Sequence, residues 1–375
     1  MGNDDTEKGR MRMTQSEFTN IRIAGIMTAV PKTTEDILEK YSPIFGEDVV
    51  RSFSKNTGVR KRRVANEQQT ASDLAYVAAD ELLKKKRIER DKVGVVIFVS
   101  QCPDYIVPAT ACVLHKRLGL KKDCMAFDVN MGCSGYVYGL QIICSLMSSM
   151  NVEYGLLLVG DTSNRDISPE DKSAAMLFGE AGSATLLERK EDVPAVKTLC
   201  RTDGNGFKAI IIPGGGFRNP KASTKREVWG DGNVRSDCDL YMDGVEVFSF
   251  SISEVPEMIN YFFDLYDTNS DKYDAYVFHQ ANCYILKQIM KRCKLPKDKV
   301  LISMENYGNT SVASIPLTIC DGYGETQDRK DVNMLMCGFG IGLSWGCVDM
   351  VINTSDIFPI IETDDYYTEG EVSHD

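Results

Sequence analysis

Cys133 stands between a predicted strand and a predicted helix, a position from which a thiol can act as a nucleophile. The strand is the short apolar run 124–129, and the helix is the run 135–150, which carries no charged residue. A helix that is apolar on most faces is typical of a protein core. At its first turn, unpaired backbone N–H groups favour a thiolate, so we expect a lowered pKa for Cys133. A buried structural cysteine would explain the same local pattern equally well.

Histidine is the usual partner of a nucleophilic thiol, and the chain has three histidines. His115 lies in a helical run beside Lys and Arg, and His374 lies in an acidic tail. His279 directly follows the predicted strand 273–278 and precedes a predicted helix. Loops at the carboxyl ends of strands are where α/β sheets build their sites, so His279 is the candidate for acid–base or hydrogen-bonding chemistry. Taken alone, it also fits a histidine whose hydrogen bonds are satisfied at a helix start.

Two further segments could complete such a site. Asn309 follows the short extended run 300–303 and precedes the predicted helix 311–320, a position that a helix cap or turn residue would also explain. The run 338–346, GFGIGLSWG, has glycine spacing that resembles a dinucleotide motif, but a strand follows it where that motif needs a helix. A glycine-rich turn that exposes backbone N–H groups suits an oxyanion hole better. Together, the four features point to nucleophilic-cysteine chemistry.

Composition excludes several other classes. The chain has 375 residues, of which 43% are hydrophobic and 26% charged, and a net charge of −11, which argues against nucleic acid as the main partner. Its 12 cysteines include no C-x-x-C pair, so zinc-ribbon and thioredoxin interpretations fail and no metal site is expected. With no signal peptide and no apolar run of about 18 residues, we expect a cytoplasmic protein with reduced thiols and no membrane span. The pattern M-G-x-x-x-[ST] at 1–6 matches a myristoylation signal, which we discount because acidic residues follow.

Strands and helices alternate along most of the chain, which predicts an α/β fold with mostly parallel sheets. The element order is similar in the two halves, which indicates a duplication. We therefore expect four parts: a mobile arm at 1–19, an N-terminal half at 20–190, a C-terminal half at 191–352 and an acidic tail at 353–375. The predicted elements, besides those named above, are strands at 21–30, 93–99, 154–159, 181–187, 332–337 and 343–352, helices at 33–41, 47–55, 71–86, 108–118, 245–265 and 282–293, and a long surface loop at 214–236.

The sequence resembles the 3-oxoacyl-[acyl-carrier-protein] synthase III family of condensing enzymes over about residues 20–352. The resemblance rests on five motifs in matching order: DVNMGCSGYVYGL (128–140), FGEAGSA (178–184), HQAN (279–282), NYGNTSVASIP (306–316) and GFGIGLSWG (338–346). It implies a thiolase-like fold of duplicated halves in five layers and a homodimer. The implied reaction is a decarboxylative Claisen condensation of an acyl thioester with a malonyl thioester, in fatty-acid or specialised acyl or polyketide biosynthesis.

The resemblance also implies roles for individual residues. Cys133 matches the family nucleophile, and His279 and Asn309 match its two partners. The backbone N–H groups of Cys133 and Ile341 would form the oxyanion hole. No cofactor is implied beyond substrates carried on coenzyme A or on an acyl-carrier protein, with malonyl delivered by the carrier protein. The residues matched to substrate or pantetheine contacts are Asn282, Phe339 and Lys172.

Several positions depart from the family pattern. Ser52 stands where the best-studied members carry a tryptophan that stacks on adenine, and Asn56 and Lys172 replace nearby arginines. Tyr284 replaces an arginine after HQAN. Basic residues that could dock an acidic carrier protein are Lys287, Lys291 and Arg292, although a solvated helix end explains them equally well. These departures suggest a specialised member of the family.

Three alternatives remain at the level of sequence. An acyltransferase could use the same acyl-cysteine to acylate an amine, an alcohol or a sugar, although Asn309 favours a reaction with an enolate to stabilise. The 3-hydroxy-3-methylglutaryl-CoA synthase branch needs an additional glutamate base that we cannot place. A non-catalytic partner subunit would usually have lost the cysteine. The length of the acyl chain cannot be predicted.

Overall fold

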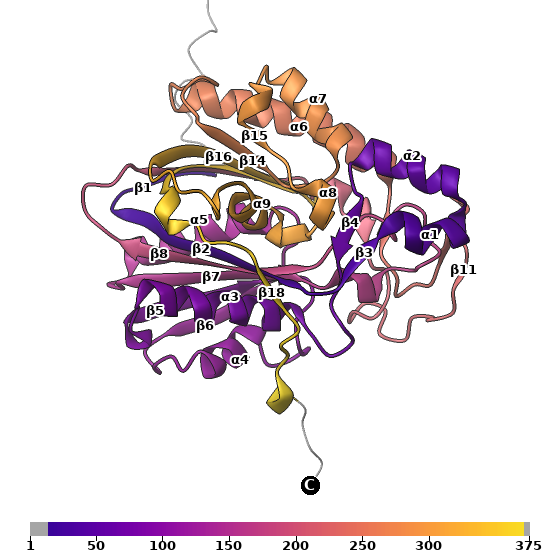
Figure 1. Cartoon of the computed structure of the whole chain (residues 1–375), viewed down its shortest axis with the longest axis horizontal. Helices are drawn as coiled ribbons and strands as arrows, with labels where there is room; N and C mark the ends of the chain where they lie inside the picture. Colours follow the sequence, from indigo (N-terminus) through magenta and orange to yellow (C-terminus); the bar gives the residue numbers. More distant parts are fainter. Residues whose placement is uncertain (1–13, 371–375) are drawn as a thin grey trace, which may run out of the picture.

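The computed structural model describes residues 14–370, and these residues form five layers. Figure 1 shows helices α6 and α7 above one sheet, helices α5 and α9 in the middle, and a second sheet with α3 and α4 beneath it. The expected five-layer, thiolase-like α/β arrangement is therefore confirmed. The myristoylation pattern at 1–6, the first 13 residues of the predicted arm and His374 lie outside the described residues.

The lower sheet carries most of the N-terminal half. Strand β5 is buried on both faces, as its uninterrupted apolar sequence VGVVIFV predicts. Strands β7, β5 and β6 run parallel to one another, whereas β8 is antiparallel to both β7 and β2. In spatial order the strands are β18 (Ile361–Thr363), β2 (Ile21–Pro31), β8 (Ala181–Arg189), β7 (Tyr154–Asp161), β5 (Val93–Val99) and β6 (Met125–Val129).

The upper sheet carries most of the C-terminal half, and its strand directions are also mixed. Strands β16, β14 and β15 are parallel, but β16 and β17 form an antiparallel hairpin. Only residues 341–343 join these two strands, too few for the crossover that a parallel pair needs. The sheets are thus less uniformly parallel than expected. In spatial order the strands are β1 (Gln15–Phe18), β9 (Val196–Thr202), β17 (Ser344–Asn353), β16 (Asp331–Gly340), β14 (Ala275–Phe278) and β15 (Val300–Leu301).

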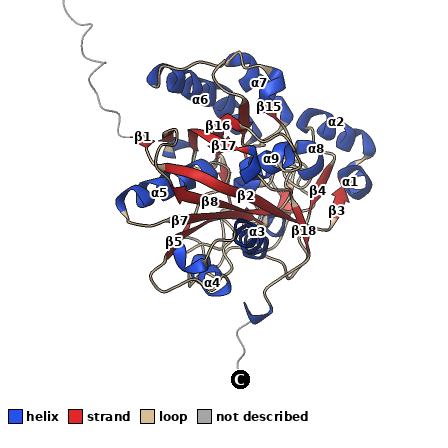
Figure 2. Cartoon of the chain, turned by 60° about the vertical axis from the view of Figure 1, so that its left-hand side comes forward, coloured by secondary structure: helices blue, strands red, loops and turns tan. Residues whose placement is uncertain are grey.

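Helices fill the other three layers. Figure 2 shows α5 and α9 between the strands of the two sheets, where their apolar faces form one continuous core with both. Two further cores lie beneath the outer helices, one between α6, α7 and the upper sheet and one between α3, α4 and the lower sheet. The helices are α3 (Ala71–Lys86), α4 (Thr110–Arg117), α5 (Gly135–Ser149), α6 (Gly244–Leu265), α7 (Cys283–Arg292) and α9 (Ser314–Tyr323).

Both ends of the described chain are ordered into the sheets, which corrects the expected arm and tail. Residues Gln15–Phe18 form β1, which pairs with β9 and buries Phe18. Residues Ile361–Thr363 form β18, which pairs in parallel with β2. Each end therefore adds a strand to the sheet built from the opposite half of the chain. The polar composition of both ends concealed this, since edge strands need only one buried face.

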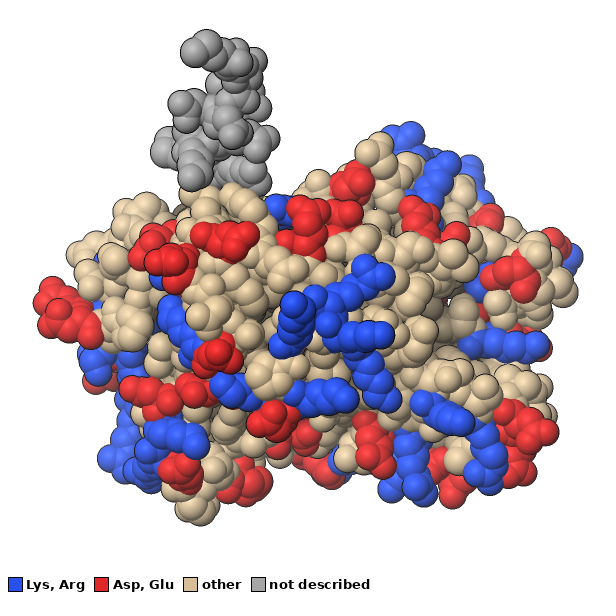
Figure 3. All heavy atoms as spheres, turned by 90° about the horizontal axis from the view of Figure 1, so that it is seen from above, with Lys and Arg blue, Asp and Glu red and all other residues tan. Residues whose placement is uncertain are grey.

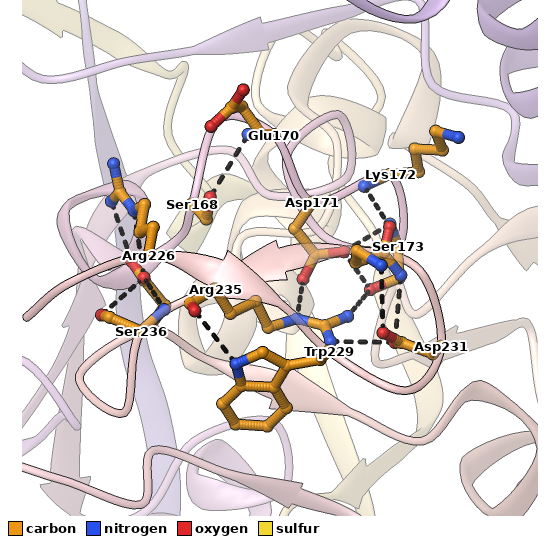
Figure 4. Close-up of polar contacts among 12 residues, drawn as sticks. Ser168, Glu170, Asp171, Lys172, Ser173, Arg226, Trp229, Asp231, Arg235 and Ser236 are labelled. Carbon is orange, nitrogen blue, oxygen red and sulfur yellow. Dashed lines mark hydrogen bonds and ion pairs between the residues drawn. The ribbon is translucent and has the colours of Figure 1, made fainter. Parts of the chain in front are cut away.

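A smaller region beside the layers forms one wall of the site described below. It contains α1 and α2, the pair β3–β4, the loop that was predicted at 214–236, and the pairs β11–β12 and β10–β13. Within it, the fully buried Arg235 donates to Asp171, which is also fully buried, and to the half-exposed Asp231 (Figure 4). The elements are α1 (Ile37–Phe45), α2 (Glu47–Thr57), β3 (Thr34–Asp36), β4 (Lys61–Arg63), β10 (Ile210–Ile211), β11 (Glu227–Val228), β12 (Val234–Arg235) and β13 (Tyr241–Met242).

The substitution Asp171→Asn should destabilise this region, because it leaves the buried Arg235 cation with only the half-exposed Asp231 as a charged partner. We expect the free energy of unfolding to fall by about 3 kcal/mol, the lower end of the cost of breaking a buried pair. Urea denaturation measures it. Asp328→Asn, which breaks an exposed pair with Lys330, is the control and should have a much smaller effect. Equal effects of the two substitutions would contradict the prediction.

Candidate active site

Cys133, His279 and Asn309 line a single cavity of about 340 Å³ between the two halves of the chain. Ile341, Asn282 and Phe339 line the same cavity. The structure therefore brings together six residues that lie on four separate segments of the sequence. The cavity is lined mainly by apolar side chains, among them Leu177, Phe178, Ile210, Leu240, Met242, Val247 and Phe248.

Cys133 lies in the turn between β6 and α5, as its sequence position predicts. The turn is closed by the Gly135 N–H, which donates to the Gly132 carbonyl at 2.7 Å. Gly135 is required here, since a Cβ at this position would lie 2.8 Å from Val99 and 2.9 Å from Val312. The cysteine is 6% exposed. The helix is thereby packed directly against the strand beneath it, with the thiol facing the cavity.

The expected low pKa of Cys133 is wrong for the resting site. Burial raises the pKa of the thiol to about 11, and the contacts with the Ile341 backbone N–H and the Ser311 hydroxyl only partly oppose this. Desolvation disfavours the thiolate more strongly than the helix end favours it. The resting cysteine is a neutral thiol, so any reaction that uses it as a nucleophile must first remove its proton.

The glycine-rich turn between β16 and β17 covers the cysteine. At Gly340 the backbone φ is +152°, and a Cβ there would lie 2.6 Å from the Cβ of Cys133. Ser344 fixes the turn, because its hydroxyl lies 2.6 Å from the Ser134 hydroxyl and also donates to the Ile341 carbonyl. The Ile341 N–H therefore reaches the sulfur of Cys133. This is the geometry in which two backbone N–H groups, those of Cys133 and Ile341, could hold an oxyanion.

His279 directly follows β14, and its backbone N–H donates to the Cys337 carbonyl of β16 at 2.8 Å. The ring is 2% exposed and stands edge-on to Phe339, with 5.5 Å between ring centroids. Its Nδ1 atom lies 2.8 Å from the Ser314 hydroxyl. Burial lowers the pKa of His279 to about 3, so the imidazole is neutral at physiological pH.

Asn309 is held by backbone contacts with the FGEAGSA segment. Its N–H donates to the Leu177 carbonyl at 2.9 Å, and its carbonyl accepts from the Gly179 N–H at 3.0 Å. A short helix, α8 (Met304–Tyr307), lies between the extended run 300–303 and Asn309, where the sequence suggested no helix. The side-chain Oδ1 accepts from the Ser311 N–H at 2.9 Å. With Oδ1 held in this way, the amide NH₂ is the group that Asn309 can offer to the cavity.

The predicted substrate contacts divide into two groups. Asn282 and Phe339 line the cavity, and Asn282 also caps α7 by accepting from the Ile285 N–H at 2.8 Å. Lys172 does not line the cavity: its side chain is exposed and points away from the Asp171–Arg235 pair (Figure 4). Ser52 and Asn56 are also exposed and lie outside the cavity lining.

The proposed docking residues lie on α7, which begins beside the cavity. Lys287, Lys291 and Arg292 are all exposed, and none forms an ion pair with a carboxylate of the described residues. Figure 3, which looks down on the face carrying α6 and α7, shows Lys and Arg side chains gathered on this face. Nearby, Tyr284 stacks on the cavity-lining Phe248 with 5.5 Å between centroids. The tyrosine that departs from the family pattern thus packs against the cavity wall.

Sequence reasoning missed three polar residues near the thiol. Ser311 and Gln101 line the cavity, and Asp161 is buried at the end of β7. Ser311 falls inside the NYGNTSVASIP motif, and Asp161 ends a strand, so both carried a usable positional signal. Within residues 14–370, no group of three or more His, Cys, Asp or Glu side chains is arranged to hold a metal ion. No helix in that part of the chain has the length and apolar character that a membrane crossing requires.

Comparison with known proteins decides the family. Models of 3-oxoacyl-[acyl-carrier-protein] synthase III and of its C-terminal part match residues 127–204 and 265–352. A Campylobacter jejuni protein that carries the name 3-oxoacyl-[acyl-carrier-protein] synthase 3 is 32% identical to this chain over 353 residues, which cover 92% of this chain and 97% of the relative. The chain belongs to the 3-oxoacyl-[acyl-carrier-protein] synthase III family. It is a condensing enzyme, and its reaction is a decarboxylative Claisen condensation.

Two further family members agree with this assignment. The beta-ketoacyl-[acyl-carrier-protein] synthase III of Clostridium perfringens is 31% identical over 291 residues, covering 77% of this chain and 87% of the relative. The crystal structure of a 3-oxoacyl-(acyl-carrier protein) synthase from Burkholderia xenovorans LB400 superposes with a TM-score of 0.86 at 36% identity, covering 93% of this chain and 99% of that one. The thiolase-like fold that the motifs implied is thus found in the solved structures of this family.

The neutral state of the buried His279 predicts how the free energy of unfolding changes with pH. Its pKa is about 3 in the folded chain and about 6.5 when exposed, so the stability that depends on the neutral ring is complete above pH 6.5 and is lost as pH falls toward 3. Between pH 7.5 and pH 5 the wild-type chain should therefore lose about 2 kcal/mol more than the variant His279→Gln. Urea unfolding at both pH values measures this difference. Equal losses would show that His279 titrates in the folded chain as it does in the unfolded chain, which would contradict a neutral, buried ring.

Proposed function

We propose that Cys133, His279 and Asn309 carry out the condensation in two half-reactions within the shared cavity. In the first, Cys133 attacks an acyl thioester and becomes acylated, and the carrier thiol leaves. In the second, a malonyl thioester enters and loses CO₂, and the resulting enolate carbon attacks the acyl-Cys133 carbonyl. The observation that carries this proposal is the convergence of a thiol, a neutral imidazole and a side-chain amide on one apolar cavity.

The first half-reaction places a negative charge on the carbonyl oxygen of the acyl group. The backbone N–H groups of Cys133 and Ile341 are fixed by the close approach of Gly340, so they need no reorganisation when this charge develops. Preorganised donors of this kind contribute about 3–4 kcal/mol each in enzymes where one has been removed. The apolar lining strengthens the effect, because it keeps water away from the oxyanion.

The second half-reaction places a negative charge on the malonyl thioester oxygen. Because Nδ1 of His279 contacts Ser314, we assign Nε2 as the nitrogen that donates to this enolate, together with the Asn309 amide. Both donors are neutral. A lowered pKa keeps His279 a poor base, so it does not activate a water molecule to hydrolyse the acyl enzyme. The proposed steps use only side chains and backbone of this chain, with no cofactor.

The carrier of the acyl group is most simply a protein-bound pantetheine arm. Among the described residues, the cavity lining includes no Lys or Arg, and Asp166 contributes a carboxylate. A neutral pantetheine arm fits this lining, whereas a phosphate does not. The exposed cations of α7 would instead meet the acidic carrier outside the cavity. The adenine contacts of the best-studied members have no replacement in the cavity, because Ser52, Asn56 and Lys172 lie outside its lining. This absence favours a specialised pathway over initiation from acetyl-CoA.

We also propose that the enzyme is a cytoplasmic homodimer. Strand β6 is the open edge of the lower sheet, and Met125 on it is 46% exposed. Ile106 and Val107 in the neighbouring loop are 83% and 80% exposed. An open strand edge beside exposed apolar side chains is typical of a surface that pairs with another chain.

Replacing the nucleophile should abolish the first half-reaction. Cys133→Ala should show no acyl adduct by intact-protein mass spectrometry after incubation with a panel of acyl thioesters. Cys102 is the other cysteine of the cavity lining, but it contacts Ser163 and the Thr162 N–H instead of the proposed oxyanion hole at Ile341. Cys112→Ala, which removes an exposed cysteine, should retain the adduct. An adduct that persists in Cys133→Ala would contradict the assignment.

Removing the amide donor should separate the two half-reactions. Asn309→Ala should still be acylated, but its release of CO₂ from malonyl thioester should fall by about 10²–10³-fold, the usual cost of one oxyanion donor. Asn205→Ala, an exposed asparagine, serves as the control. Unaffected CO₂ release in Asn309→Ala would contradict the assignment of Asn309 as a donor to the enolate.

Reversing a charge on α7 should weaken recognition of a carrier protein only. Lys291→Glu should raise the KM for malonyl-carrier protein several-fold while leaving the KM for malonyl-pantetheine unchanged, because the free thioester meets only the start of α7, at Asn282 and Ile285, and not the exposed end that carries Lys291. The matched control is Lys122→Glu, which makes the same charge change at an exposed residue before β6. Steady-state kinetics with both substrates measure these KM values. Equal changes in the KM for malonyl-carrier protein in the two variants would refute the docking surface.

A further inference from the structure

A buried carboxylate lies beneath the cysteine and has no cationic partner. Asp161, the last residue of β7, is 1% exposed. Its Oδ1 accepts from the Ser100 hydroxyl at 3.0 Å and from the Gln101 N–H at 2.8 Å. Its Oδ2 is also buried but has no partner at hydrogen-bond geometry within residues 14–370, and no Lys or Arg of that part of the chain pairs with it. Burying such a group is costly, which a purely structural role does not explain.

Ser311 connects this carboxylate to the thiol. The turn η5 (Ser311–Ala313) packs against β7, and Ser311 itself has a φ of +48°, a backbone conformation that side-chain-bearing residues rarely adopt. Ser311 lines the same cavity as Cys133, and its hydroxyl lies near both the Cys133 thiol and the Asp161 carboxylate, although this hydroxyl forms no hydrogen bond to Asp161 Oδ2 in the resting site. The Val312 N–H also approaches the carboxylate. A serine hydroxyl both donates and accepts, so it can pass a proton between two such groups.

The charges around the thiol require an acceptor for its proton. A fixed negative charge on Asp161 raises the pKa of Cys133, which opposes a nucleophile unless the carboxylate itself becomes neutral as the thiolate forms. Burial raises the pKa of Asp161 and makes it a stronger base, whereas burial makes His279 a weak one. The other titratable group beside the carboxylate is Cys102, whose pKa is raised by burial and by Asp161 and Asp166.

We propose that Asp161 accepts the thiol proton of Cys133 through the Ser311 hydroxyl when Cys133 attacks the acyl thioester. The S–H bond breaks and its proton passes to Ser311 Oγ, while the proton of that hydroxyl passes to Asp161 Oδ2. The thiolate forms the new C–S bond, and the departing carrier thiolate takes a proton from solvent. This inference rests on the proposed role of Cys133 as the nucleophile.

The second half-reaction returns the stored proton. When the 3-oxoacyl product forms, Cys133 leaves as a thiolate, and the proton moves back from Asp161 through Ser311 to the sulfur. The full cycle therefore consumes one proton from solvent, which ends on the carrier thiol, and releases one CO₂. Asp161 touches no substrate in either step and acts only through Ser311.

The rate of Cys133 alkylation by iodoacetamide, followed by mass spectrometry of the Cys133 peptide from pH 5 to pH 10, tests this directly. The wild-type thiol and carboxylate share one negative charge, so the rate should change by less than about threefold between pH 6.5 and pH 8.5. In Asp161→Asn this plateau should disappear, and the rate should rise about tenfold per pH unit because the thiol then titrates alone. In Ser311→Ala the plateau should remain, because the carboxylate is still present, but acylation of Cys133 by an acyl thioester should slow by about 10²-fold because the path of the proton is lost. At pH 10, Asp161→Asn should equal or exceed the wild type, which also shows that its site is folded.

Two controls and three outcomes complete the test. Asp104→Asn removes another mostly buried carboxylate, one that accepts from Ser72, and should keep the wild-type curve, while the exposed Cys112 is an internal standard for the reagent. A wild-type plateau in Asp161→Asn would overturn the inference. Acylation of Ser311→Ala at the wild-type rate would do the same, because the carboxylate would then act without the serine. A normal plateau in a wild-type chain that no acyl thioester acylates would overturn the proposed function and leave the proton relay standing.

Discussion

The backbone around Gly340 approaches the backbone around Cys133 so closely that one methyl group could not fit between them. A Cβ on Gly340 would lie 2.6 Å from the Cβ of Cys133, and a Cβ on Gly338 would lie 2.9 Å from the Cα of Ser134. This contact joins the hairpin of the upper sheet to the first turn of the central helix α5. It places the Ile341 N–H beside the sulfur and closes the cavity on one side. Without it, the two halves of the chain would not share a site.

The same burial that brings the groups together sets their protonation states. Cys133 and His279 both rest in their neutral forms, the thiol because its pKa is raised and the imidazole because its pKa is lowered. Neutral donors suit the stabilisation of an enolate, but a neutral thiol is a poor nucleophile. A buried acceptor such as Asp161 resolves this conflict, since the site then keeps one negative charge throughout the acylation step. Desolvation thus both limits the chemistry and makes a proton relay necessary.

Much of the site could be predicted from sequence, because each main residue lies at a strand end or helix start in a short motif. Cys133, His279 and Asn309 meet in the cavity as those positions suggested. Other features depended on tertiary structure. The strands β1 and β18 are too short and polar to signal pairing, and whether Lys172 reaches the cavity depends on how the 214–236 loop packs. The pKa of Cys133 depends on how deeply the layers bury it, and the contact of Asp161 with Ser311 joins segments 150 residues apart by crossing between the halves.

A single-turnover experiment tests the central claim most directly. The enzyme is first acylated at Cys133 with an isotopically labelled acyl group, separated from the donor, and then mixed with a malonyl thioester. The account predicts that labelled 3-oxoacyl thioester, CO₂ and unmodified Cys133 appear at one rate and in equal amounts. Transfer of the label to an amine, an alcohol or water without matching release of CO₂ would contradict it.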